Sequence, residues 1–267
     1  MRTDALSKIT SGPARLAEAR SARFVAWLSL GDAEPTDEEL WASGTTDFIS
    51  LETRAYQRPI PPSRMRALRD NNRALEPNLF SRAMVAGVLR WLERSDDSGE
   101  FQDFFYTGGR AWKSQQPDSW CLRFRNAAER PGFRAGLDPT LVLEAIPAVA
   151  SIEAQKTLQL DGHSVEFVEG RADLRVVADR LQDYLKVPGM RQRAQGWYDS
   201  APIRLWIDDT ALIRRISYAP LPPPDPRSPQ RAWTTLHLSD FGTPIDRPAF
   251  FGTSCSQANP VRPAPGK

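Results

Sequence analysis

Two long β-forming runs near the C-terminal end constrain the fold more than any other part of the sequence. Residues 205–216 read Leu-Trp-Ile-Asp-Asp-Thr-Ala-Leu-Ile-Arg-Arg-Ile, which is a pair of apolar segments around a short polar turn. Residues 234–245 add a third apolar segment, which stops at Asp-Phe-Gly-Thr-Pro. Two strands joined by a tight turn and followed by a third are typical of an antiparallel sheet. The stretch therefore predicts one edge of a large antiparallel sheet, and it contains no enzyme motif.

The same hairpin pattern recurs earlier in the chain. Gly108 and Gly109 separate two apolar runs and can supply the positive φ angles of a tight turn, and Asp161-Gly162 is a second such turn. Alternation over residues 44–56 predicts one strand with a wetter side. Further strands are expected at 24–30, 101–106, 110–114, 120–124, 152–160, 163–174, 202–208, 212–218 and 233–241.

Three or four short helices interrupt these strands. Residues 4–22 have an apolar helical face, which a Gly-Pro pair at 12–13 divides into two short helices or one kinked helix. An Asp-Pro pair at 138–139 begins another helix, which Pro147 ends, and residues 173–186 have a helical period. The sequence thus predicts an α+β fold: a single strongly curved antiparallel sheet, with helices covering its concave face.

The length of 267 residues lies near the upper limit for one hydrophobic core, and no segment reads as a flexible linker. We expect a single domain over residues 1–258 and a disordered, proline-rich tail over 259–267. The charges of the 35 basic and 33 acidic side chains nearly cancel, so the protein as a whole has no strong positive potential that would attract a polyanion. Nucleic acid is therefore not an expected partner.

The closing motifs carry a resemblance to a known family. The Trp-Ile-Asp hairpin at 206–208 and the Ser-Asp-Phe-Gly-Thr-Pro stop at 239–244 resemble the closing segment of actinobacterial lipid carriers of the LppX and LprG type, relatives of the LolA-like lipoprotein carriers. The specific part of the likeness covers about residues 137–245. It implies a half-barrel whose sheet and helices enclose acyl chains, a lipid or acylated ligand, and a role in the cell envelope.

Side chains on the inward faces of the sheet and helices are the candidates to line such a pocket. Each methylene group that moves from water into an apolar cavity gains about 0.8 kcal/mol, so few polar contacts are needed. The alternative is that the same residues simply pack against one another. The candidates are Trp27, Phe104, Val142, Ile146, Leu181, Tyr184 and Leu185.

A cluster of arginines follows the second predicted strand. These side chains are candidates to hold an anionic lipid headgroup or to touch a membrane surface, and the alternative is an ordinary solvated face. The residues are Arg64, Arg66, Arg69 and Arg73.

The sequence offers little that could support catalysis. The two histidines, His163 and His237, are not near a Gly-x-Ser-x-Gly nucleophile motif. Cys121 and Cys255 lack the spacing of a zinc site. We therefore expect a monomeric, non-catalytic ligand-binding protein without a cofactor or metal. The alternatives are a scaffold of the same fold without an open cavity or, less in keeping with the sequence, an acyl hydrolase.

The most apolar run near the N-terminal end, residues 24–30, is too short to span a bilayer. It lacks a positively charged leader and a small-residue cleavage site. The chain as written is expected to be soluble and cytoplasmic, and to act in the cell envelope if a leader has been removed or misassigned.

Overall fold

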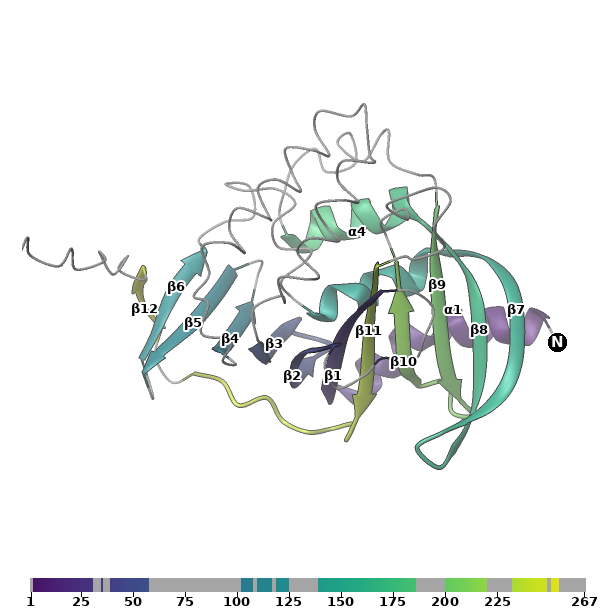
Figure 1. The fold of residues 1–267 in the computed structure, drawn as a ribbon, viewed down its shortest axis with the longest axis horizontal. Helices are drawn as coiled ribbons and strands as arrows, with labels where there is room; N and C mark the ends of the chain where they lie inside the picture. The colour runs from purple at the N-terminus through teal and green to yellow at the C-terminus, as the bar shows by residue number, and fades with distance from the viewer. Residues whose placement is uncertain are drawn as a thin grey trace, which may run out of the picture.

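The computed structural model describes residues 2–30, 35, 39–57, 102–107, 110–116, 119–124, 139–185, 200–219, 232–248 and 251–254. The predicted tail, residues 259–267, and the four arginines proposed for headgroup contact lie outside these ranges. One sheet dominates the described part of the chain (Figure 1).

The sheet has 12 strands in the order β12-β6-β5-β4-β3-β2-β1-β11-β10-β9-β8-β7. Every neighbouring pair is antiparallel except β12 and β6, which are parallel. The sheet is open, with β12 and β7 at its edges. The bounds are β1 Ser21–Leu30, β2 Leu40–Asp47, β3 Glu52–Gln57, β4 Gln102–Thr107, β5 Arg110–Gln116, β6 Ser119–Phe124, β7 Val149–Leu160, β8 His163–Asp173, β9 Ser200–Asp208, β10 Ile213–Tyr218, β11 Ala232–Ser239 and β12 Phe251–Ser254.

The prediction of one strand over residues 44–56 is wrong, because β2 and β3 are separate strands joined by a turn. One carboxylate oxygen of Asp47 accepts hydrogen bonds from the backbone amides of Ile49 and Ser50, both at 2.9 Å. Leu51 completes the turn with a φ of 55°. Ile49 and Leu51 are apolar and so extended the alternating pattern of a strand in the sequence. In the structure both are exposed in a turn that the Asp47 hydrogen bonds define.

In the described part of the chain, three helices accompany the sheet: α1 (Arg2–Ala19), the 3₁₀ helix η3 (Pro139–Ala148) and α4 (Leu174–Leu185). Of the two alternatives for the N-terminal segment, the structure has one helix, with Pro13 inside it. A Cβ atom at Gly12 would lie 2.7 Å from Cδ1 of Ile213, so this glycine allows α1 to approach β10 closely. η3 begins at the predicted proline but runs past Pro147 to Ala148.

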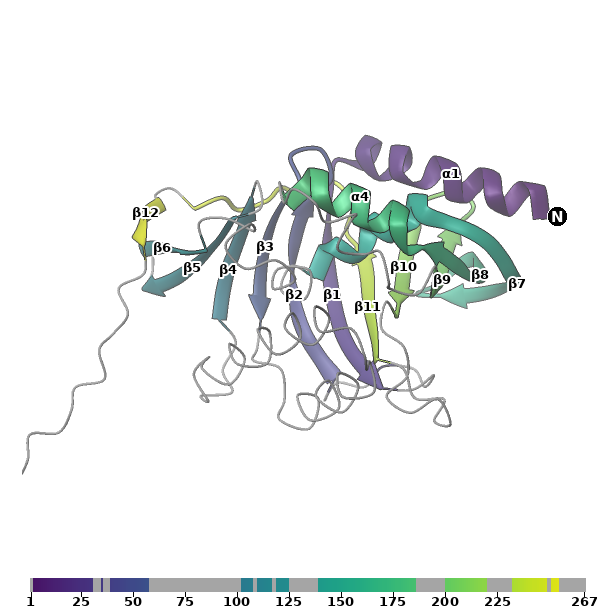
Figure 2. The ribbon, with the colours of Figure 1, turned by 90° about the horizontal axis from the view of Figure 1, so that it is seen from above.

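The helices lie on the concave side of the bent sheet. η3 packs on β8, β10 and β11, and α1 and α4 both pack against η3. Figure 2 shows the sheet from above, with α4 crossing in front of its centre and α1 along the β9 and β10 side. The predicted fold class, an open and strongly curved antiparallel sheet with helices on its concave face, is confirmed.

Candidate ligand-binding site

A continuous group of buried apolar side chains fills the space between sheet and helices, and we name it the concave cluster. Side chains alternate between the two faces of a strand, so every second residue of these strands points inward. Isoleucine and leucine dominate the central strands, which suits a pleated surface that is buried on this side. The largest members from the sheet are Phe24, Trp41, Phe104, Tyr106, Ile203, Leu205, Ile207, Ile213, Ile216, Tyr218, Leu236 and Leu238.

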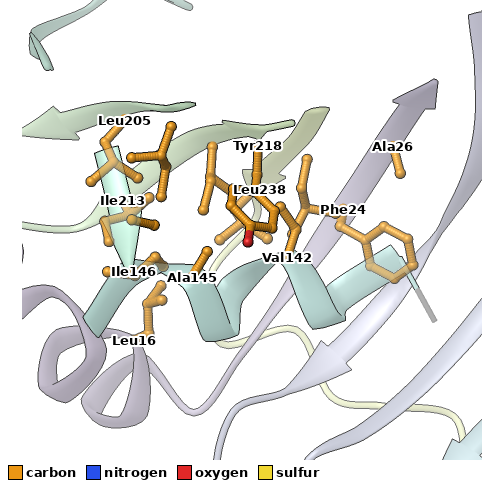
Figure 3. Packing of buried hydrophobic residues seen from close by; sticks show 14 of the residues in the cluster. Leu16, Phe24, Ala26, Val142, Ala145, Ile146, Leu205, Ile213, Tyr218 and Leu238 are labelled. Carbon is orange, nitrogen blue, oxygen red and sulfur yellow. The ribbon is translucent and has the colours of Figure 1, made fainter. Parts of the chain in front are cut away.

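η3 supplies the opposing side of the concave cluster. Val142, Ala145 and Ile146 project from it toward the strands and are 6%, 0% and 1% exposed (Figure 3). Val142 and Ala145 are one turn apart in a 3₁₀ helix and so share a face, and Ile146 follows Ala145 directly. Side chains from η3 and from the central strands therefore fill the space between them, and they form an ordinary packed core over that part of the sheet.

The apolar face also extends toward β4, away from the strands that the helices mainly contact. Phe104 and Tyr106 are both buried, with ring centroids 6.1 Å apart and planes inclined by 20°. The Tyr106 hydroxyl donates a hydrogen bond to the side-chain oxygen of Gln57 on β3. Thr53 and Thr140 join β3 to the first turn of η3 through their hydroxyls, 3.1 Å apart. The helices make their main sheet contacts with β1 and with β8 to β11, so the concave cluster is wider than their footprint.

The structure brings together three of the seven residues that the sequence suggested for the lining. Phe104, Val142 and Ile146 all belong to the concave cluster. Trp27 does not join it: this residue is half-buried and pairs with Thr235, whereas its neighbours Ala26 and Leu28 pack in the cluster. Alternation along β1 therefore places Trp27 on the convex face. Leu181, Tyr184 and Leu185 lie in α4, but their side chains are outside the described part.

Tyr218 is a concave residue that sequence reasoning missed. It lies on β10 two positions after Ile216, and the same alternation would have placed it inward. Its ring projects toward η3 near Val142 (Figure 3). The hydroxyl is buried and has no hydrogen-bond partner among the residues that the structure describes. Burial raises the pKa of Tyr218 above its ordinary range, so the phenol stays protonated and is available as a donor.

Asp208, the last residue of the Trp-Ile-Asp motif, organises the β9–β10 turn. Its Oδ1 accepts from the backbone amides of Thr210 and Leu212 at 2.9 and 3.0 Å and from the Thr210 hydroxyl at 2.7 Å. Its Oδ2 accepts from Nε of Arg214 at 2.8 Å. Burial alone would raise the pKa of Asp208, but these hydrogen bonds outweigh it and hold the pKa below its ordinary value. The carboxylate is thus ionised and has a structural role.

The other parts of the closing motifs are also structural. Trp206 packs edge-on against Phe167, with ring centroids 4.9 Å apart, in a second apolar cluster on the convex face. In the Asp-Phe-Gly stop, Gly242 has a φ of 85° and its amide donates to the carbonyl of Ser21 at 2.7 Å. Phe241 lies under the guanidinium of Arg214, 5.0 Å from the ring centroid. The motifs therefore fix the hairpin and the end of β11.

His237 takes part in a contact on the convex face. Its Nε2 lies 3.0 Å from Oδ2 of Asp161, at the tip of the β7–β8 hairpin, although β11 and β8 are separated by two strands in the sheet. Burial lowers the pKa of His237; Asp161 opposes this effect, while Arg215 and Arg214 add to it. The imidazole is therefore neutral near pH 7 and lies in close polar contact with the Asp161 carboxylate. The contact helps to hold the bent hairpin against the outer face.

The described residues give no support to an acyl hydrolase. Within the described part of the chain, no serine, threonine or cysteine is hydrogen-bonded to His237, so the His237–Asp161 pair has no nucleophile beside it. No group of three or more potential metal-ligating side chains occurs in those same ranges. No helix among the described residues is long and apolar enough to cross a membrane.

Comparison with known proteins gives similarities of fold at low sequence identity. No family model matches the chain, and no curated protein matches its sequence. LprF from Mycobacterium bovis is similar at 14% identity and a TM-score of 0.47, over 91% of this chain and 95% of that chain. The lipoprotein LppX from Mycobacterium tuberculosis is similar at 13% identity and a TM-score of 0.44, over 90% and 98%. A LolA superfamily protein from Nitrosomonas europaea follows at 8% identity and a TM-score of 0.24, over 86% and 92%.

Proposed function

We propose that this protein is a non-catalytic binder or carrier of a lipid or another acylated hydrophobic molecule. The ligand would lie between the curved sheet and its helices. The observation that carries the proposal is the width of the concave cluster, which continues to Phe104 and Tyr106 on β4 beyond the main footprint of the helices. An acyl chain laid along this surface gains about 0.8 kcal/mol for each methylene removed from water, so a single chain suffices for useful affinity.

A scaffold of the same fold, without an open cavity, is the second candidate. It is favoured by the tight packing of η3, where Ala145 and Ile146 are 0% and 1% exposed. A packed interior of this kind stabilises the fold by itself and needs no ligand. The two candidates differ in one measurable property, which is the uptake of lipid by the purified protein.

A pair of valine-to-tryptophan variants tests the carrier proposal. Val142 faces the concave cluster from η3, whereas Val176 is exposed on α4. Val142→Trp fills the space beside the concave strands, so we expect it to reduce uptake of a fluorescent fatty-acyl lipid from phosphatidylcholine vesicles at least several-fold. Val176→Trp makes the same change on the outside and should bind as the wild type does. Overpacking costs about 1–3 kcal/mol of stability, so both variants should stay folded by circular dichroism.

The outcome separates the two functions. Uptake by the wild type and by Val176→Trp, with loss in folded Val142→Trp, supports the carrier. Absence of uptake in all three proteins favours the scaffold. Equal uptake by all three proteins would place the bound lipid somewhere other than the concave cluster.

A further inference from the structure

The Tyr218 hydroxyl is a buried polar group in the concave cluster, and it has no hydrogen-bond partner within the described ranges. Hydrogen-bond donors and acceptors in protein interiors are almost always paired, and an unpaired one costs stability. Tyr106, in the same cluster, follows that rule through its hydrogen bond to Gln57. The Tyr218 hydroxyl does not follow that rule among the described residues. Its nearest labelled neighbours, Val142 and Leu238, are aliphatic and offer it no hydrogen bond (Figure 3). A phenylalanine would fill the same space without this cost.

We propose that Tyr218 anchors the bound lipid, its hydroxyl donating a hydrogen bond to a neutral carbonyl oxygen of the ligand, such as that of an ester. This inference rests on the proposed function and adds a specificity-determining residue to it. A neutral acceptor is the fitting class because an ionised headgroup would have to give up its hydration among the aliphatic side chains around Tyr218. The acyl chain would then extend over the concave cluster toward Phe104.

The helix above Tyr218 is suited to move aside for such a ligand. η3 is a ten-residue 3₁₀ helix, whereas helices of this type seldom exceed three or four residues because their hydrogen-bond geometry is poor. Pro147 inside it has no amide hydrogen to donate. η3 is held in place mainly by the side chains that it buries, among them Val142 and Ile146. An acyl chain can replace those contacts with equivalent apolar ones, and the carbonyl would then satisfy the Tyr218 hydroxyl.

Tyr218→Phe tests the inference, with Tyr106→Phe as the matched control. The probes are methyl laurate and the alkane with the same number of heavy atoms, each competing with a fluorescent fatty-acid analogue for delipidated protein. One hydrogen bond corresponds to roughly a tenfold change in affinity. We expect Tyr218→Phe to bind the ester about tenfold more weakly than the wild type and the alkane equally well. Tyr106→Phe should change the two affinities by the same factor.

The stability of the delipidated proteins gives a second readout. Tyr218→Phe should melt at the same temperature as the wild type or higher, because it removes an unpaired hydroxyl, whereas Tyr106→Phe should melt lower, because it leaves Gln57 unpaired. A lower melting temperature for Tyr218→Phe would show that its hydroxyl is satisfied inside the protein and would overturn the inference. Equal ester affinity in Tyr218→Phe and the wild type would also overturn it, while leaving the proposed function intact. Failure of the wild type to bind either probe would overturn the proposed function itself.

Discussion

Replacement of Asp208 by asparagine should destabilise the protein by about 3 kcal/mol. Asparagine keeps an oxygen that can accept from Thr210 and Leu212, but it turns an amide donor toward the Arg214 guanidinium. Loss of a charge-assisted hydrogen bond costs about 1.5–3 kcal/mol, and removal of one partner of a buried ion pair costs about 3–5 kcal/mol. The Arg214 side chain is 20% exposed, so water compensates in part and the lower end applies.

Urea unfolding followed by tryptophan fluorescence measures this change. At neutral pH the midpoint for Asp208→Asn should fall by about 1 M urea relative to the wild type. Asp209→Asn is the control, because Asp209 is the exposed neighbour in the same turn, and its unfolding free energy should change by less than about 0.5 kcal/mol. Equal midpoints for the two variants would refute the assignment of Asp208 as the organiser of the β9–β10 turn.

The same substitution has a defined pH dependence. The folded-state pKa of Asp208 lies below its ordinary value, so its carboxylate contributes stability that is present above the pKa of the unfolded chain and is lost as the pH falls through the folded pKa. The difference in unfolding free energy between the wild type and Asp208→Asn should therefore shrink in acid. A difference that stays constant from neutral to strongly acidic pH would contradict this linkage.

Two further predictions concern the convex face and the sheet. Because the folded-state pKa of His237 is lowered, protonation favours the unfolded chain, and the stability of the protein should fall as the pH drops from about 7 to about 5. Thermal unfolding should show that His237→Gln removes this part of the pH dependence. The control His163→Gln, at an exposed position, should keep it. A Cβ atom at Gly44 would lie 1.9 Å from the backbone oxygen of Arg54, so Gly44→Ala should lower the free energy of unfolding in urea by at least about 3 kcal/mol. Gly162 has open space around it but a φ of 77°, so Gly162→Ala should lower this free energy by about 1 kcal/mol.

The sequence was most informative where polar turn residues separate apolar runs. The hairpin around Asp208 and the hairpin around Asp161-Gly162 are both found as predicted. Asp161 and Gly162 favour the positive φ angles that they adopt, whereas the other turn is closed by the hydrogen bonds that Asp208 accepts. The predicted helix at 173–186 is α4. Phe104, which was a candidate for the inward face of the sheet, belongs to the concave cluster. These features depend on neighbours in the chain, which a sequence reveals directly.

The features that were missed depend on tertiary contacts. Residues 24–28 are all apolar, so alternation in the sequence could not assign Trp27 to the convex side. The β2–β3 turn was missed because Ile49, an apolar residue, is exposed within it. Whether the Tyr218 hydroxyl finds a hydrogen-bond partner among the described residues depends on side chains that are distant in the sequence, so no local sequence pattern could reveal that it has none there.

Native mass spectrometry of the wild-type protein, purified from cells without detergent, tests the central claim most directly. If the concave cluster accommodates an acylated ligand, the spectrum should contain a species heavier than the chain by the mass of a lipid. Collisional activation should release that lipid, and Val142→Trp should lack the species. A spectrum in which the wild type has only the mass of its own 267 residues, together with no uptake from vesicles, would contradict a carrier function.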